Sequence, residues 1–152
     1  MKIYLNEIFD EKAIRFNLDG KPKNMIFTEL IGGIADLYPE CDRNEIYTAI
    51  MEREEKMSTG IGYGIAIPHA FSKGIDKIAG AVGISKEGVD YGALDKKPVH
   101  IVFLLIANEH EREAHLHVFN QLFKLAQSEA IDLVKNAKNV QDVHGVLSRF
   151  LL

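Results

Sequence analysis

Hydrophobic positions along the chain recur with two periods, one typical of helices and one typical of strands. The clearest helical period covers Glu113–Gln127, with a predicted apolar face of Leu116, Phe119, Leu122, Phe123 and Ala126. Another helix is predicted between Asn24, a candidate cap, and Pro39, which ends it. Further helices are predicted after Asp42, over Glu129–Lys135, and after the candidate cap Asn139, whose helix turns Val143, Leu147 and Phe150 inward.

Three segments have the features of strands. Ala13–Leu18 and Ile78–Ser85 show apolar residues at alternating positions. Pro98–Ala107, PVHIVFLLIA, is a continuous apolar run, which predicts a central strand buried on both faces. Because helices interleave with these strands, we predict an α/β fold, a single-domain sandwich whose mixed central β-sheet is flanked by helices on both faces. Residues 1–152 are expected to form this one domain.

Composition and charge narrow the range of functions. Hydrophobic residues make up 47% and charged residues 26%, a globular balance. A formal net charge of −4 argues against nucleic acid as the partner, because phosphate backbones attract basic surfaces. Cys41 is the only cysteine, which suits a reducing compartment. The N-terminal sequence has no signal-peptide features, and the longest apolar run, Ile101–Ala107, is too short to cross a bilayer. We therefore expect a cytoplasmic protein without direct membrane insertion.

The stretch STGIGYGIAIPHA, Ser58–Ala70, combines three glycines, Gly60, Gly62 and Gly64, with a Pro-His pair. Glycines let the backbone bend sharply and approach a ligand closely, and consecutive N–H groups can hold an anion. Glycines at period two also occur in crowded or bulged strands, which is the structural alternative.

His69 is the candidate nucleophile of this stretch. Pro68 fixes the backbone directly before it, and a neutral imidazole needs little activation near neutral pH. Arg53 precedes the glycines, and a guanidinium can hold phosphate oxygens in bidentate fashion. These residues together favour a transferable anion bound at His69, while an ordinary Pro-His loop is the alternative.

The other histidines do not have the spacing of a helical zinc site. His110 and His115 lie five positions apart, whereas an HExxH site places its histidines four apart on one helix face. His115 and His117 are two apart and point to separate sides of a helix. We expect His110 and His117 to face solvent and His100 to be a hydrogen-bonded strand histidine. No metal site is predicted, and a metal-dependent hydrolase is the least favoured function.

The run EEKMSTGIGYGIAIPHA, Glu54–Ala70, resembles the phosphohistidine signature of the type-2 EIIA domains of the bacterial phosphoenolpyruvate:sugar phosphotransferase system (PTS). These are the fructose/mannitol-type and nitrogen-regulatory IIA proteins. An acidic residue, a fixed gap, a glycine and an Ala-aliphatic-Pro-His element stand in register, and similarity extends through Arg53, Pro98-Val99 and His115-Leu116. Tyr63 departs from the pattern, since many relatives have Asn or His there. The resemblance implies the mannitol-type IIA fold.

The resemblance also implies roles for individual residues. His69 would accept a phosphoryl group from the histidine phosphocarrier protein HPr, or from a nitrogen-branch HPr. His115 would stabilise that phosphoryl group, and Arg53 would offset its charge. The resemblance implies no metal and no organic cofactor. The residues that would shape a phosphate-binding loop are Thr59, Gly60, Gly62 and Gly64.

Three outputs are compatible with this resemblance. A sugar-transport component for fructose/mannitol-type sugars would pass the phosphoryl group to a cysteine of a IIB domain. A nitrogen-regulatory protein would instead bind partner proteins according to its phosphorylation state, and the lack of a IIB, IIC or HPr-like extension favours this output. A binding module that kept the fold without the chemistry is the third. Partners are expected to dock on an apolar rim formed by Ile61, Tyr63, Ile65 and Phe71.

Overall fold

The long apolar run of the sequence forms β6 (Val99–Ala107), the central strand of a mixed sheet. The computed structural model describes residues 3–149. In it β6 pairs antiparallel with β5 (Ile78–Val89) and parallel with β3 (Ile65–Ala66) and β4 (His69–Phe71). Alternate β6 side chains enter two separate hydrophobic cores, with Val102 and Leu104 on one face of the sheet and the neighbouring Phe103 on the other. The prediction of a central strand buried on both faces is confirmed.

Two short strands complete the six-stranded sheet. β1 (Ile14–Arg15) pairs parallel with β5, and β2 (Gly60–Gly62) pairs antiparallel with β3. The order is β1-β5-β6-β3-β2, and β4 pairs with β6 farther along that strand than β3 does. The predicted strand over Ala13–Leu18 is reduced to β1, because a 3-10 turn occupies Glu11–Ala13 and only the two residues of β1 pair with β5.

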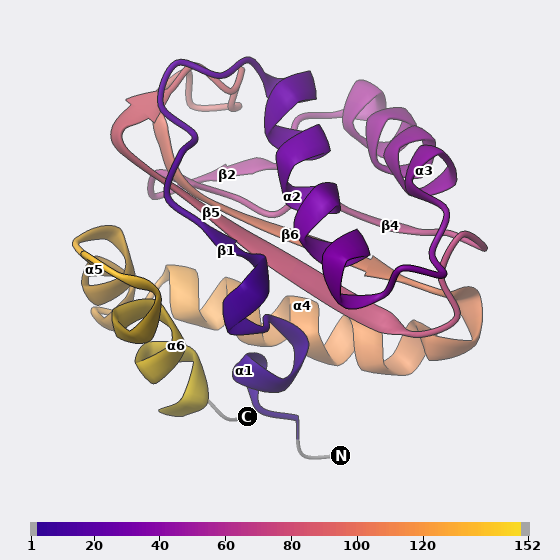
Figure 1. The fold of residues 1–152 in the computed structure, drawn as a ribbon. Coiled ribbons are helices and arrows are strands. Elements are labelled where there is room, and N and C mark those ends of the chain that lie inside the picture. The colour runs from indigo at the N-terminus through magenta and orange to yellow at the C-terminus, as the bar shows by residue number, and fades with distance from the viewer. Residues whose placement is uncertain (1–2, 150–152) are drawn as a thin grey trace.

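Helices cover both faces of the sheet, as predicted (Figure 1). On one face lie α2 (Lys23–Leu37) and α3 (Arg43–Lys56). The opposite face is covered by four helices: α1 (Leu5–Ile8), α4 (Arg112–Ala126), α5 (Ala130–Lys135) and α6 (Val140–Arg149). A second 3-10 turn, Glu109–Glu111, leads into α4. None of the helices within residues 3–149 has the length and apolar composition required to span a membrane.

The helix boundaries follow from capping chemistry. Asp42 accepts hydrogen bonds from the backbone N–H groups of Asn44 and Glu45, and Asn139 accepts one from Asp142 N–H. The helix predicted after Asp42 and the predicted cap Asn139 are therefore confirmed. The predicted cap Asn24 is wrong, because α2 begins at Lys23 and Asn24 lies inside its first turn. Phe150, predicted to turn inward, lies outside the described residues.

The buried face of α4 differs from the predicted one. Leu116 is 60% exposed and Phe123 is 39% exposed, whereas Val118, Leu122 and Leu125 are fully buried. Apolar residues surround more of this helix than the sheet can cover, so periodicity alone did not identify the face that packs on β6. The exposed apolar residues of α4 are therefore available to contact other molecules.

Candidate functional site

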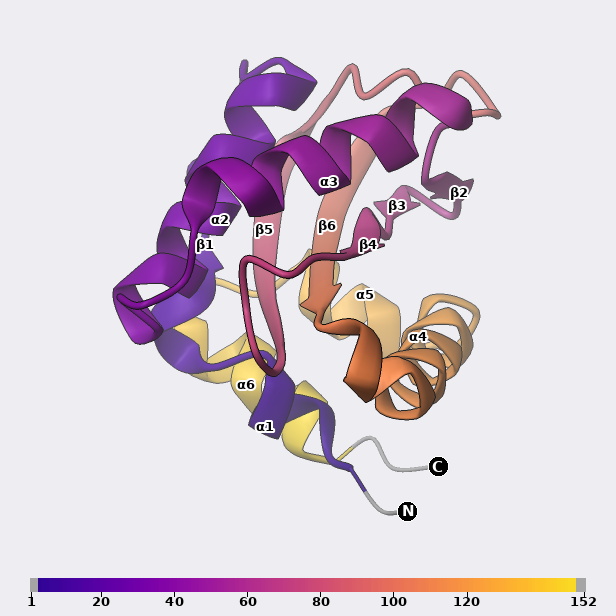
Figure 2. The same ribbon diagram turned by 90° about the vertical axis from the view of Figure 1, so that its right-hand side faces the viewer.

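His69 begins β4, where it pairs with Leu105 of β6 (Figure 2 shows β4 beside β6, between α3 and α4). Its Nδ1 lies 2.8 Å from the backbone oxygen of Ile67. A carbonyl oxygen only accepts hydrogen bonds, so Nδ1 carries the proton and Nε2 of the neutral ring keeps a free electron pair. Within residues 3–149, no group hydrogen-bonds this Nε2. The local fold thus fixes the tautomer in which Nε2 keeps its free electron pair.

His115 lies in the first turn of α4, with its ring centroid 5.7 Å from that of His69. Its side chain is buried, and its Nε2 has no hydrogen-bond partner among the described residues. The Phe71 ring lies 4.5 Å from the His115 ring and carries the guanidinium of Arg112 above it. Burial, then the neighbouring His69 and Arg112, lower the pKa of His115 to about 4. His115 is therefore neutral at physiological pH and keeps an unsatisfied polar atom beside His69.

The surroundings of His69 also favour its neutral form. Phe119 of α4 packs against it with ring centroids 4.8 Å apart. Burial lowers the pKa of His69, and the positive charge of Arg53 lowers it further. The hydrogen bond to the Ile67 oxygen and the charge of Glu54 act in the opposite direction without reversing the shift. A neutral ring with a free Nε2 is the state that can attack phosphorus.

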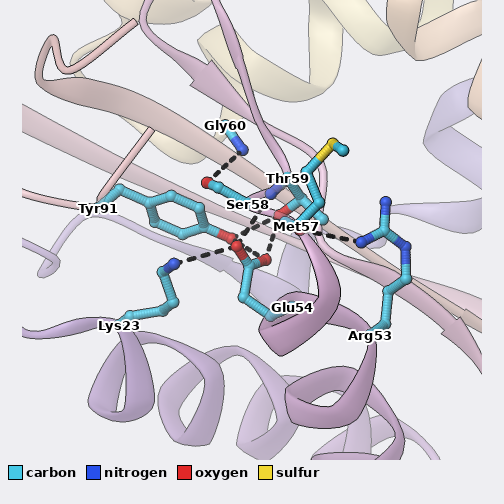
Figure 3. Close-up of polar contacts among 8 residues, drawn as sticks. All are labelled: Lys23, Arg53, Glu54, Met57, Ser58, Thr59, Gly60 and Tyr91. Carbon is cyan, nitrogen blue, oxygen red and sulfur yellow. Dashed lines mark hydrogen bonds and ion pairs between the residues drawn. The ribbon is translucent and has the colours of Figure 1, made fainter. Parts of the chain in front are cut away.

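Arg53 lies in the last turn of α3, where its Nη1 donates a hydrogen bond to the Met57 oxygen at 3.0 Å (Figure 3). That bond holds the side chain at the end of the helix. The positive charge of Arg53 lowers the pKa of His69. The structure thus brings together three of the predicted site residues: His69, His115 and Arg53.

The predicted phosphate-binding loop has a different place in the fold. Gly62, Tyr63 and Gly64 have positive φ angles of 92°, 60° and 73°, and they form the hairpin turn between β2 and β3. Gly62 lies opposite Ile65, which pairs with Ile101, four residues before the partner of His69. That offset is about 13 Å along β6, at ~3.3 Å per residue. The structure therefore does not bring Gly62 and Gly64 to His69.

Thr59 and Gly60 lie nearer to His69, yet their N–H groups are already used. The N–H of Thr59 donates to Glu54, and that of Gly60 donates to the Ser58 hydroxyl (Figure 3). Gly60 is needed for close packing, since a Cβ there would lie 2.6 Å from the Cβ of Ala93. These contacts give both residues a structural role. They offer no free anion nest of the kind the sequence suggested.

The predicted docking rim and the predicted exposure of His117 need correction. Ile65 is fully buried in the core and cannot belong to a rim, whereas Tyr63 is 61% exposed. Ile61 and Phe71 are half-buried, and Phe71 pairs with Ala107 at the other end of β6 from the hairpin that holds Tyr63. His117 was expected to face solvent, but it is half-buried and its Nε2 is buried without a partner among the described residues. His100 matches its prediction, since its Nδ1 bonds the Ser85 oxygen at 3.0 Å.

A buried carboxylate network beside the site was missed by sequence reasoning. Glu54 is 6% exposed and accepts hydrogen bonds from the Thr59 N–H at 2.9 Å, from the Thr59 hydroxyl, and from Tyr91 and Lys23 at 3.0 Å each (Figure 3). Burial favours a raised pKa for Glu54, but the bonds from Thr59 and Lys23 outweigh it and lower the pKa. Glu54 is the acidic residue that begins the signature run, but no spacing in the sequence links it to its distant donors Lys23 and Tyr91. Within residues 3–149, no three His, Cys, Asp or Glu side chains gather in a way suited to a metal ion.

Comparison with known proteins gives a family match over residues 7–150, to the model described as "Phosphoenolpyruvate-dependent sugar phosphotransferase system, EIIA 2". The chain is 37% identical over 127 residues to the PTS system fructose-specific EIIABC component of Bacillus subtilis, covering 84% of this chain and only 20% of that relative. It is 30% identical over 146 residues to the nitrogen regulatory protein of Pseudomonas aeruginosa, covering 95% of each.

Solved structures have the same fold. The nitrogen regulatory protein IIA-Ntr from Neisseria meningitidis superposes with a TM-score of 0.80 at 26% identity, covering 93% of this chain and 97% of that one. The Escherichia coli complex of mannitol IIA with phosphorylated mannitol IIB gives a TM-score of 0.75 at 19% identity, covering 90% and 94%. At that identity the second likeness concerns the fold alone.

Proposed function

The chain belongs to the EIIA type-2 phosphocarrier family of the phosphoenolpyruvate-dependent sugar phosphotransferase system, and we propose that Nε2 of His69 is the atom that carries the phosphoryl group. The observation that carries this proposal is the hydrogen bond from Nδ1 to the Ile67 oxygen. That bond fixes the proton on Nδ1 and leaves Nε2 as the free nucleophile. The lowered pKa of His69 keeps the ring neutral under the conditions of transfer.

The reaction consists of two in-line transfers. In the first, the Nε2–phosphorus bond of His69 forms while the nitrogen–phosphorus bond of a phosphohistidine donor breaks, and the donor nitrogen keeps the electron pair. In the second, an acceptor takes the phosphoryl group from Nε2, which regains its electron pair. Nδ1 keeps its proton and its bond to Ile67 throughout. The donor is HPr or a nitrogen-branch HPr.

His115 and Arg53 have supporting roles in this proposal. The unpartnered Nε2 of His115 can carry a proton and donate it to a phosphoryl oxygen. The guanidinium of Arg53 offsets the negative charge that accumulates on those oxygens. Phe119 packs on the His69 ring, which restricts the ring's orientation and the access of water.

A phosphorylation assay tests the assignment of His69. Purified protein is incubated with phosphoenolpyruvate, enzyme I and HPr of either branch, and its intact mass is recorded. We expect the gain of one acid-labile phosphoryl group, lost in His69→Ala and retained in the control His144→Ala, which changes a histidine beside Glu11. A phosphoryl group that persists in a folded His69→Ala protein would refute the assignment. So would a wild-type protein that stays unmodified by donors from its own organism.

The favoured output is regulation of partner proteins by the phosphorylation state of His69. Supporting it are the TM-score of 0.80 to the Neisseria IIA-Ntr structure and the coverage of 95% of both chains in the Pseudomonas alignment. The alternative is transfer to a IIB cysteine in sugar transport, supported by the 37% identity to the fructose-specific relative. Adding purified fructose-type or mannitol-type IIB to the phosphorylated protein separates them. Rapid movement of the phosphoryl group to the IIB cysteine would favour transport, and its retention on His69 would favour regulation.

A further inference from the structure

We propose that Glu54 is a positioning residue for phosphoryl transfer, which holds His69 in its reactive tautomer through a chain of hydrogen bonds. The inference rests on the proposed role of His69. The chain starts at the Glu54 carboxylate, which accepts the Thr59 N–H at 2.9 Å. The Thr59 oxygen accepts the Ile67 N–H at 3.0 Å, and the Ile67 oxygen accepts His69 Nδ1–H at 2.8 Å. Three consecutive bonds thus connect the carboxylate to the imidazole.

Each bond in this chain fixes the position of the next acceptor. Thr59 lies just before the hairpin strand β2, and its carbonyl is the group that orients Ile67. Ile67 lies between β3 and β4, with only Pro68 separating it from His69. If Thr59 shifts, the Ile67 oxygen shifts with it, and the Nδ1 proton loses its acceptor. The tautomer of His69 therefore depends on the hydrogen bonds that hold Ile67 and Thr59 in place, although neither of these bonds involves the imidazole ring.

Glu54 also secures the segment that holds Arg53. Arg53 is its immediate neighbour in α3 and bonds the oxygen of Met57, directly after the helix end. The chain then turns through Ser58 to Thr59, where both the N–H and the hydroxyl are bound by Glu54 (Figure 3). One carboxylate thereby fixes the segment that restrains the guanidinium and the segment that orients the imidazole.

Glu54 is itself held rigidly by Thr59 and by groups from two distant parts of the chain. Tyr91, in the β5–β6 connection, and Lys23, at the start of α2, each donate to it at 3.0 Å. The Nζ of Lys23 also lies 4.4 Å from the centre of the Tyr91 ring. A buried carboxylate has a large desolvation cost, and an apolar side chain could fill the same volume. A carboxylate held by this many donors is suited to fixing geometry to within the fraction of an ångström that transfer requires.

The test compares Glu54→Met, which fills the volume without an acceptor, with Glu54→Gln, which keeps an oxygen for the Thr59 N–H. The control is Ser85→Ala, which removes a different buried hydrogen-bonding group far from His69. The Ser85 hydroxyl donates to Asp19 and accepts the Gly88 N–H. Nitrogen-15 NMR of the unphosphorylated proteins reports the tautomer of His69. Circular dichroism checks folding, and the intact-mass assay gives the phosphorylation rate.

We expect Nδ1–H His69 in the wild type, Ser85→Ala and Glu54→Gln. In Glu54→Met we expect a mixture of tautomers and a phosphorylation rate about 10- to 100-fold lower, in line with the effect of a displacement of about 1 Å in a reacting group. An unchanged tautomer and rate in folded Glu54→Met would overturn the inference. An Nε2–H tautomer in the wild type would overturn it without any variant. Because the NMR readout needs no phosphoryl donor, its outcome is separate from whether His69 is phosphorylated at all.

Discussion

At the scale of single residues, the site consists of two histidines kept neutral by their surroundings. Burial lowers the pKa of both His69 and His115, and the positive side chains Arg53 and Arg112 lower them further. A neutral His69 can attack phosphorus, and a neutral His115 can donate one proton without adding a charge beside it. The same burial makes the stability of the fold sensitive to acid, because both histidines are protonated more easily in the unfolded chain.

His115 should therefore contribute to acid sensitivity of the fold. Its pKa falls from 6.5 to about 4 on folding, so the unfolded chain binds more protons as the pH falls below 6.5. Stability is lost as the pH falls through this range, and the loss is complete below about 4. We expect the wild type to lose on the order of 2 kcal/mol more than His115→Asn between pH 7 and pH 5, at ~1.4 kcal/mol per pKa unit. Urea denaturation across that range measures the difference, and parallel curves would contradict it.

The sequence identified the residues of the candidate site more completely than it identified the groups that surround them. His69, His115 and Arg53 were identified from a local signature and its extension along the chain, and the fold brings them together. The Glu54 network was not identified, because its donors Lys23 and Tyr91 lie far from it in sequence. The tautomer of His69 was equally inaccessible, since it depends on which backbone oxygen the ring meets.

At the scale of elements, the long segments were predicted, whereas the short strands of the glycine-rich stretch were not. β6 and α4 have enough residues to show a period, whereas β2, β3 and β4 have two or three each. β3 and β4 form by pairing with β6, and β2 forms by pairing with β3, so tertiary contacts rather than local periodicity determine these strands. The glycines between them were interpreted as a phosphate loop, although a Gly-x-Gly between two apolar runs is also a hairpin signal.

Two glycine-to-alanine substitutions distinguish the effect of close packing on stability from the effect of intrinsic helix preference. Gly60→Ala places a Cβ 2.6 Å from Ala93 Cβ and 2.9 Å from Ala93 Cα, so backbone must move. We expect a loss of about 1–3 kcal/mol in the free energy of unfolding, typical of overpacking. Gly145→Ala, in α6, meets nothing within 4 Å and should gain about 0.5–1 kcal/mol. Thermal or urea unfolding measures both, and changes of the same sign would show that the close contact at Ala93 is not the deciding factor.

At the scale of the whole molecule, His69 lies where β4 meets the C-terminal half of β6, between α3 and α4 (Figure 2). In the proposed reaction, donor and acceptor both reach Nε2 of His69, so we expect them to approach across the same surface. Leu116 of α4 is 60% exposed and lies one turn from Phe119, which contacts the His69 ring. This exposed apolar residue beside the site is suited to docking a partner.

Leu116→Arg tests whether that surface serves both transfer steps, and Leu133→Arg is its matched control. Leu133 is 56% exposed, in α5 rather than beside His69, so both variants exchange a similar exposed side chain. We expect either substitution to change stability by no more than about 0.5 kcal/mol. Leu116→Arg should raise the donor concentration for half-maximal phosphorylation about 10-fold, as loss of an interface anchor does, and it should slow release to any acceptor that takes the phosphoryl group from His69. Equal rates in the two variants would place docking elsewhere. A defect in only one of the two steps would show that donor and acceptor approach Nε2 across different surfaces.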